Sequence, residues 1–542
     1  MSTLSENEAA ALARLRRAVR TEDVSLVAAG SPDAVHAGCE HDSQAEAGRA
    51  AREDGHFESQ DGGITLKHLA IRGASLTIAG AGLNHALRLV GNLILTRLLA
   101  PDLFGLMALV NIVLQGLHMF SDVGIRGSII RSKYGDDIDF LNTAWTFQLI
   151  RGFVLFGVCC ALAWPAAKFY DAAALGILLP VAGMSAAIGG FASMGLMTAK
   201  RNIRLGRLTF VELLSQLAGL ATMITWAVLR PSVWALVAGG LVSVSVRMAL
   251  SHALMGGVFP RLKWKREHAA ELMVFGRWIL LSTALTFLAT QGDRLFFGKV
   301  LTLDRLGVYA IAVMLATFPA QLVSRLSMDV MFPAYSAVLR RGTHLSSVFH
   351  RMRSPMAIYS AAISAFLVAA GPWLIDVLYD DRYAAAGWML RIVGAGMLFR
   401  VLASTNGAAL LAAGRPSAVA AGNGTKFAGM LVLVPVGWWL YGLTGTLVGL
   451  VVAEALPYCA TVLFLRSIRL SVWRHDTLLF LGCASTAGLG YLAGTVLETQ
   501  LSARGVIVLM AVAAALAALW SPVLYRVTQR VLCQSPQEPL VH

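Results

Sequence analysis

Charged and amide side chains interrupt several long apolar runs of this sequence, and their spacing suggests a binding site rather than a catalytic one. Arg88 and Asn92 are four residues apart, and Gln291 and Arg294 are three apart, so each pair lies on one face of a helix. An Arg at the centre of a bilayer costs about 2.5–3.5 kcal/mol on insertion scales. Such a residue is therefore expected to face a water-filled cavity or a partner.

These side chains predict a cavity that is more basic than acidic. The predicted substrate-binding residues are Arg88, Asn92, Gln291, Asp293, Arg294, Arg391 and Arg400. A guanidinium group binds phosphate in a bidentate manner, so an anionic, phosphate-linked substrate suits this set. Asp293, Glu212 and Glu454 are the candidate carriers if transport is coupled to a proton or sodium gradient.

A plainer interpretation stands beside this one. Arg151, Arg247, Glu212 and Lys426 lie near the ends of their apolar runs, so their side chains could extend to the lipid headgroups. Asp293 and Arg294 could form a local neutralising pair. Neither interpretation involves a metal ion or a cofactor.

Composition sets the class of protein to which these residues belong. The chain has 542 residues, of which 57% are hydrophobic and 14% are charged, and its mean hydropathy is +0.65. Apolar runs of about 20 residues match the roughly 30 Å hydrocarbon layer of a bilayer. The net charge of +14 is attributed to loops that face an anionic membrane surface, because no nucleic-acid-binding motif is present.

The pattern predicts an all-α integral membrane protein with about fourteen transmembrane helices. These form two pseudo-symmetric six-helix lobes around a central cavity, followed by two C-terminal helices. The predicted helices are 74–96, 103–122, 141–164, 173–199, 209–229, 232–255, 272–299, 304–328, 355–378, 384–413, 417–440, 442–465, 477–497 and 505–526. The predicted divisions are a polar, largely disordered tail (1–70), the first lobe (71–258), a basic linker (259–271), the second lobe (272–466), the last two helices (467–528) and a C-terminal tail (529–542).

An internal repeat supports the two-lobed arrangement. Residues 91–107 and 293–309 each read as an apolar helix end, a tight polar turn and a second apolar helix. A shift of 202 positions pairs Arg97 with Lys299 and Gly105 with Gly307. Because each copy opens a comparable series of apolar helices, the repeat is interpreted as half of the molecule.

Loop charge predicts the orientation. Basic residues concentrate in every second connection, which places the N- and C-termini in the cytoplasm. The short connections on the other side carry only Arg97, Lys168, Arg230, Lys299, Arg305, Arg382 and Arg504.

Three segments carry a family resemblance. LTRLLAPDLFGLMALV (95–110), SDVGIRGSIIR (121–131) and DRLFFGKVLTLDRLGVYAIAV (293–313) resemble the Wzx-type oligosaccharide flippases, a polysaccharide-transporter family within the multidrug/oligosaccharidyl-lipid/polysaccharide exporter superfamily. The resemblance covers about residues 70–470. It implies that the protein moves undecaprenyl-diphosphate-linked oligosaccharides across the bacterial inner membrane by alternating access. It also suggests membrane lipids, a polysaccharide polymerase and chain-length machinery as partners.

Two other functions were weighed. A cation-coupled exporter of drugs or small molecules from the same superfamily would favour acidic cavity residues, whereas basic residues predominate here. A membrane glycosyltransferase or polymerase would need a sizeable external loop, and the predicted outer loops are short. Since no nucleotide-binding or zinc motif is present either, the protein is predicted not to be an enzyme.

Overall fold

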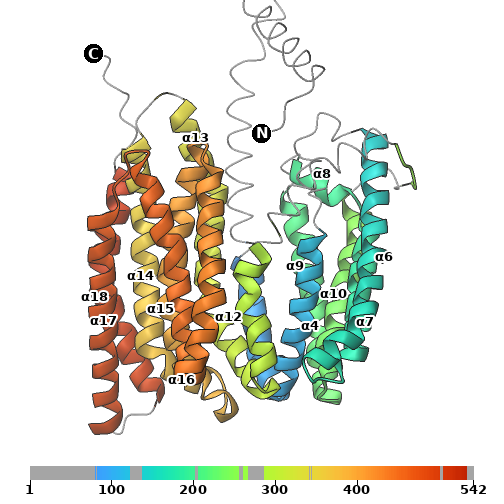
Figure 1. Ribbon diagram of the computed structural model, residues 1–542, viewed down its shortest axis with the longest axis horizontal. Coiled ribbons are helices and arrows are strands. Elements are labelled where there is room, and N and C mark those ends of the chain that lie inside the picture. The colour runs from blue at the N-terminus through green and yellow to red at the C-terminus, as the bar shows by residue number, and fades with distance from the viewer. Residues whose placement is uncertain are drawn as a thin grey trace, which may run out of the picture. The chain divides into compact units, whose positions relative to one another are not determined.

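The structure is a computed structural model that describes residues 80, 82–121, 137–201, 205–255, 261–265, 283, 286–340, 342, 345–500 and 505–533, all within the unit Ala70–His542. Every regular element in these ranges is a helix (Figure 1). Ten of the described helices are long and apolar enough to cross a membrane, with α16 counted once. The prediction of an all-α integral membrane protein is confirmed, whereas the predicted tail at 1–70 lies outside the described residues.

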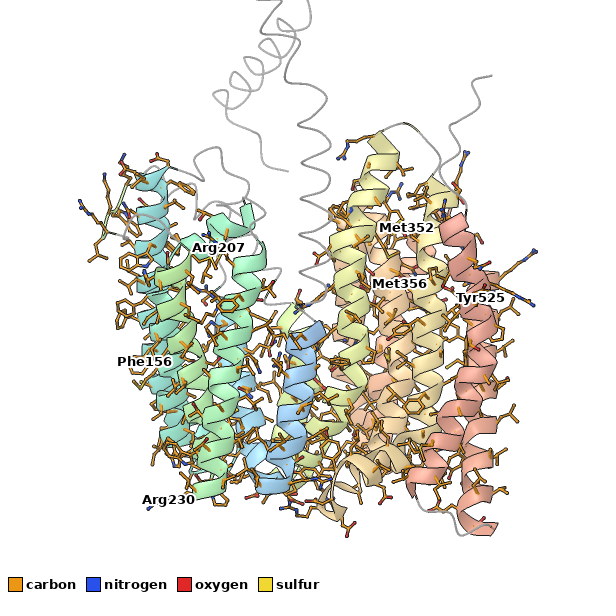
Figure 2. The ribbon with its side chains drawn as sticks, turned by 180° about the vertical axis from the view of Figure 1, so that it is seen from behind. Phe156, Arg207, Arg230, Met352, Met356 and Tyr525 are labelled. Carbon is orange, nitrogen blue, oxygen red and sulfur yellow. The ribbon has the colours of Figure 1, made fainter. Side chains whose placement is uncertain are left out.

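The first lobe is built from pairs of packed helices. Helix α6 packs against α7, α9 packs against α10, and α10 also contacts α7. Figure 2 shows Arg207 and Arg230 at opposite ends of α9, as expected for a helix that crosses the apolar layer. The helical segments are 82–98, α4 (Pro101–Phe120), α6 (Ile138–Phe169), α7 (Leu175–Gly190), α8 (Gly195–Arg201), α9 (Leu205–Leu229) and α10 (Val233–Leu254).

The second lobe has a longer series of packed helices. Helix α15 packs against both α14 and α16, and the last two helices, α17 and α18, pack against α14. The segments are 286–300, α12 (Leu303–Leu326), the π-helical η1 (Ser327–Met331), α13 (Phe332–Arg340), α14 (Leu345–Leu378), the 3-10 turn η2 (Asp381–Tyr383), α15 (Ala386–Ala412), α16 (Pro416–Arg466), α17 (Trp473–Gln500) and α18 (Gly505–Cys533).

Helix α16 contains two helical segments that meet at a sharp turn. The backbone leaves the helical conformation at Tyr441 and at Gly442, where φ is +57° and ψ is −136°. L-residues rarely adopt this conformation, and glycine adopts it without steric cost. The turn lies where the sequence predicts a boundary between helices 417–440 and 442–465.

The predicted single helix at 173–199 is wrong, because α7 ends at Gly190 and α8 begins at Gly195. The Gln148 side chain stabilises the break by donating hydrogen bonds to the carbonyl oxygens of Gly189, Gly190 and Ala192 at 3.0–3.3 Å. These carbonyl groups at the C-terminus of α7 have no continuing helix to pair with. The predominantly apolar sequence 173–199 is therefore divided into two helices at a position that Gln148 of α6 stabilises.

Other helices extend beyond their predicted ends. The segment α12–η1–α13 continues to Arg340 rather than ending at 328, and α14 begins at Leu345 rather than 355. The first turns of α14 are polar, so hydropathy gives no sign of them. One of these residues, Arg353, is nevertheless only 1% exposed, because it forms an ion pair with Asp476 of α17.

The two lobes meet along α4 and α12, which occupy equivalent positions in the repeat. In Figure 1 both helices lie at the boundary where the first lobe adjoins the second. Part of the predicted linker, residues 261–265, has no regular secondary structure and lies on α6: the Arg261 and Lys263 backbone N–H groups donate to the side chains of Asn142 and Thr146 at 2.9 and 3.1 Å. This stretch of the linker is therefore attached to the first lobe.

Candidate functional site

A cavity of about 870 Å³ lies between the lobes, at the ends of the helices away from the 99–103 turn. Four of its lining residues come from the first lobe, namely His85, Arg88, Leu89 and Gln115. The others come from 286–300, α12, η1, α15 and α16. The second lobe therefore supplies most of the wall in the described part of the chain.

Five of the seven predicted binding residues line this cavity. They are Arg88, Gln291, Asp293, Arg294 and Arg400, and Glu454, a predicted coupling residue, lines it as well. The Arg294 Nη1 donates to Gln291 Oε1 at 3.0 Å, as their spacing on one helical face predicts. Arg88 is exposed, and within the described residues it has no hydrogen bond or ion pair.

The structure does not bring Arg391 to the cavity. Its Nε donates to the carbonyl oxygen of Val368 at 3.0 Å, and its guanidinium carbon lies 3.9 Å from the centre of the Tyr491 ring. Arg391 and Arg400 are nine residues apart on α15, a separation of about two and a half turns. The two side chains therefore leave opposite faces of the helix, and Arg391 links α15 to α14 and α17 within the second lobe.

Asn92 and Glu212 also lie outside the cavity lining. Asn92 is one turn beyond Arg88, and its Nδ2 donates to the Tyr379 hydroxyl of the other lobe at 3.4 Å. Glu212 is half-buried on α9, a helix that supplies no lining residue. Neither side chain is placed to contact a molecule in the cavity in this arrangement of the lobes.

A cluster of charges forms the wall of the cavity on α15 and α16. The Oε1 atom of Glu454 accepts hydrogen bonds from Lys426 Nζ at 2.7 Å and from Arg400 Nε at 3.1 Å, and it also pairs with Arg400 Nη2. The Lys426 and Glu454 side chains are only 11% and 12% exposed, whereas that of Arg400 is 42% exposed. Among the residues that the structure describes, the cavity carries four cations, Arg88, Arg294, Arg400 and Lys426, against the carboxylates of Asp293 and Glu454.

Asp293 has a different environment from Glu454. Its Oδ2 accepts a hydrogen bond from the buried Tyr309 hydroxyl at 2.6 Å. Its Oδ1 is buried, and no hydrogen-bond donor to it is found in the described ranges. A buried polar atom without a partner is costly, so Asp293 Oδ1 is a candidate contact for a bound molecule or ion.

Sequence reasoning missed Lys426 as a site residue, although a signal was present. Lys426 and Glu454 lie at comparable distances before and after the turn at Gly442, so an antiparallel hairpin brings them together. His85 was also missed, although it lies three residues before Arg88 and so shares its helical face.

The lobes are closed at the other end of these helices by polar contacts from two cations of the second lobe, Lys299 and Arg382. Lys299, at the end of segment 286–300, donates to the Phe169 carbonyl oxygen at 2.6 Å and pairs with Asp171 at 3.0 Å. Arg382, also of the second lobe, donates from Nη2 to the carbonyl oxygens of Thr96 and Arg97 in the first lobe at 3.2 and 3.3 Å. The second lobe therefore contributes both cations, and each of them donates to backbone carbonyl groups of the first lobe.

Arg382 is itself held by a neighbouring carboxylate. Its Nη2 lies 2.5 Å from Asp380 Oδ2, and this hydrogen bond holds the pKa of Asp380 below its ordinary value. Both residues lie in the connection between α14 and α15. The pair fixes the orientation of the guanidinium group that contacts the first lobe, and we refer to these contacts of Lys299 and Arg382 as the closure.

Comparison with known proteins connects this geometry to a family. The model of a family described as polysaccharide biosynthesis protein matches residues 94–387, more than half of the chain. The chain is 24% identical to the succinoglycan biosynthesis transport protein ExoT of Rhizobium meliloti (strain 1021), over 54% of this chain and 59% of that protein. It is 20% identical to the lipopolysaccharide biosynthesis protein WzxC of Escherichia coli (strain K12), over 81% and 90%.

Among solved structures, the fold matches lipid II flippase MurJ in an inward closed conformation with a TM-score of 0.68. The match covers 83% of this chain and 99% of that one, at 10% sequence identity. At this level of identity the match establishes the fold: two pseudo-symmetric helical lobes with a cavity between them. The resemblance stated from the sequence is confirmed at the level of the family.

Proposed function

The chain belongs to the polysaccharide biosynthesis protein family, and from this premise we propose that it flips lipid-linked oligosaccharides across the bacterial inner membrane. The substrate is an undecaprenyl-diphosphate-linked repeat unit destined for a surface polysaccharide or exopolysaccharide. The observation that carries this proposal is the cavity between the lobes, where the described lining residues include four cations and two carboxylates. Such a cavity is complementary to a diphosphate and unsuited to an organic cation.

Arg88 and Arg294 are proposed as the first contacts for the diphosphate. They come from equivalent helices of the two lobes, and both line the cavity. Among the described residues, Arg88 has no competing acceptor, and the one acceptor found for Arg294 is the neutral Gln291. A diphosphate bound between them would therefore not have to displace a carboxylate from either side chain.

The predicted orientation supports a direction of access. If the termini are cytoplasmic, the closure by Lys299 and Arg382 lies on the periplasmic side and the cavity lies nearer the cytoplasm. The substrate would enter from the cytoplasmic leaflet and leave after the closure opens and the other ends of the lobes come together. Translocation of this kind breaks no covalent bond, and a polymerase with its chain-length machinery would act on the product.

Deletion of the gene in a polysaccharide-producing host tests this function. Complete, unpolymerised repeat units should accumulate on the lipid carrier in the cytoplasmic leaflet, and wild-type protein supplied in trans should remove them. Incomplete repeat units in the deletion strain would instead indicate a role in synthesis and would contradict the proposal.

A further inference from the structure

One carboxylate oxygen in the cavity wall serves two cations. Glu454 Oε1 accepts from both Lys426 and Arg400, whereas no donor to Glu454 Oε2 and no acceptor for Arg400 Nη1 is found within the described ranges. The three groups carry two positive charges and one negative charge. This cluster, which we call the Glu454 triad, thus has one net positive charge and unused hydrogen-bonding capacity.

A second buried ion pair in the same lobe, Arg353 with Asp476, differs because both carboxylate oxygens accept hydrogen bonds. Arg353 donates to both oxygens of Asp476 at 2.7 Å, and their side chains are 2% and 1% exposed. Asn406 and Tyr458 occupy further positions around the pair. That pair has no exposed face, whereas Arg400 in the Glu454 triad is 42% exposed and lines the cavity.

We propose that Glu454 is a resident counter-anion that sets how tightly the cavity holds the phosphate groups of its substrate. This inference rests on the proposed function and deepens it by assigning a phosphate subsite to the second lobe. In this subsite the Nη1 group of Arg400 donates to a phosphate oxygen. Lys426 lies on the buried side of the Glu454 triad and adds a second positive charge without contacting the phosphate. Glu454 is a positioning residue: it aligns Arg400 and cancels one of the two charges, so that the substrate binds without being trapped.

The net charge of the subsite determines how strongly it holds a phosphate group. Two uncompensated cations in a partly buried site would hold a diphosphate strongly and would be costly when the site is empty. A triad with no net charge would leave little attraction for the substrate. A transporter must also release its substrate, so an intermediate net charge suits a binding site that is loaded and emptied in each cycle.

Binding of anions to the purified full chain tests the inference through a charge series. The probes are inorganic pyrophosphate and geranyl diphosphate, measured by calorimetry in detergent at low ionic strength. Glu454→Gln should bind both probes about tenfold or more tightly, since a unit charge is lost within hydrogen-bonding distance of two cations. Lys426→Met should bind them about tenfold more weakly, and the double variant Glu454→Gln/Lys426→Met should return to within about threefold of wild type.

The control is Glu498→Gln, which removes a carboxylate outside the cavity where Glu498 accepts from Trp373 Nε1 at 3.0 Å. It should leave the affinity for both probes unchanged. A purely structural role for Glu454 predicts weaker binding in Glu454→Gln, so tighter binding separates the two roles. If Glu454→Gln does not fold, the difference between Lys426→Met and the double variant carries the same test.

Four outcomes are distinguishable. Equal affinities across the folded variants would overturn the role of Glu454 while leaving the proposed function in place. Binding of neither probe by wild-type protein would contradict the cationic site on which the proposed function depends. Tighter binding of geranyl diphosphate than of pyrophosphate would identify a lipid diphosphate as the source of the phosphate groups, whereas the reverse order would identify a free inorganic anion.

Discussion

Gly105 of α4 and Gly307 of α12 face each other where the two lobes cross. A Cβ atom added to Gly105 would overlap the carbonyl oxygen of Leu303, and one added to Gly307 would overlap that of Pro101. Both glycines and both carbonyl groups are related by the 202-residue shift of the repeat. The contact is therefore reciprocal, which is the arrangement expected around a pseudo-two-fold axis between the lobes.

This contact predicts a large effect of small substitutions. Gly105→Ala and Gly307→Ala should each destabilise the crossing by about 1–3 kcal/mol, because backbone atoms rather than flexible side chains stand in the way. Polysaccharide output should fall while protein level in the membrane is retained. Gly157→Ala is the control, since nothing lies within 4 Å of a Cβ at that position. Normal output from both variants would show that the crossing does not need glycine.

The closure predicts a shift in conformational equilibrium. Arg382→Ala removes the partly buried hydrogen bond to Thr96 and the exposed one to Arg97, and each is worth about 1 kcal/mol. In a background without native cysteines, Thr290→Cys should then react severalfold faster with a membrane-impermeant maleimide added from the periplasm. Arg230→Ala, which changes an exposed cation at the end of α9, should leave the rate unchanged. Equal rates in both variants would remove Arg382 from the closure.

The buried ion pair of Arg353 and Asp476 predicts that replacing one partner destabilises the protein more than replacing both. Asp476→Asn should lower the free energy of unfolding by about 3–5 kcal/mol, because it leaves a buried guanidinium group without its counter-charge. Replacing both residues, as Arg353→Met/Asp476→Leu, should recover most of this loss. Thermal unfolding in detergent measures both changes. A double variant no more stable than Asp476→Asn would contradict this explanation.

Arg391 and Arg400 lie on the same helix, α15, but their replacement should affect different properties, namely stability for Arg391 and transport for Arg400. Arg391→Ala should lower the melting temperature, because it removes the contacts with Val368 and Tyr491, while transport per molecule stays near the wild-type value. Arg400→Ala should reduce transport about tenfold or more, because it changes the cavity wall. Output normalised to protein level separates the two effects. A loss of transport in both variants, at equal stability, would argue against this assignment of helix faces.

The same two arginines show what could be predicted from the sequence. Their depth in an apolar run identified both as unusual, and their nine-residue separation already implied opposite faces. The repeat was likewise visible as two short segments, and it became the contact between α4 and α12. Periodicity and composition therefore predict the class of fold, the two lobes and six of the described residues that line the cavity.

The remaining features depend on contacts between distant segments. The Gln148 side chain, which lies on α6, binds the carbonyl groups where α7 ends. Asp476 of α17 supplies the counter-charge that allows Arg353 to be buried in a polar stretch of α14. Neither effect can be read from local hydropathy. Lys426 was ambiguous because a lysine near a span end can reach the headgroups, and only the α16 hairpin places it against Glu454.

The central claim is that Arg88 and Arg294 bind a lipid-linked diphosphate during its translocation. The most direct measurement is the rate at which an undecaprenyl-diphosphate-linked oligosaccharide, initially in the inner leaflet of proteoliposomes, becomes accessible to an external lectin. Wild-type protein and Arg391→Ala should accelerate this exposure over empty liposomes to within about twofold of each other, whereas Arg88→Ala/Arg294→Ala should be slower by about tenfold or more. Equal rates for the double variant and the wild type, or no acceleration by wild-type protein, would contradict the account.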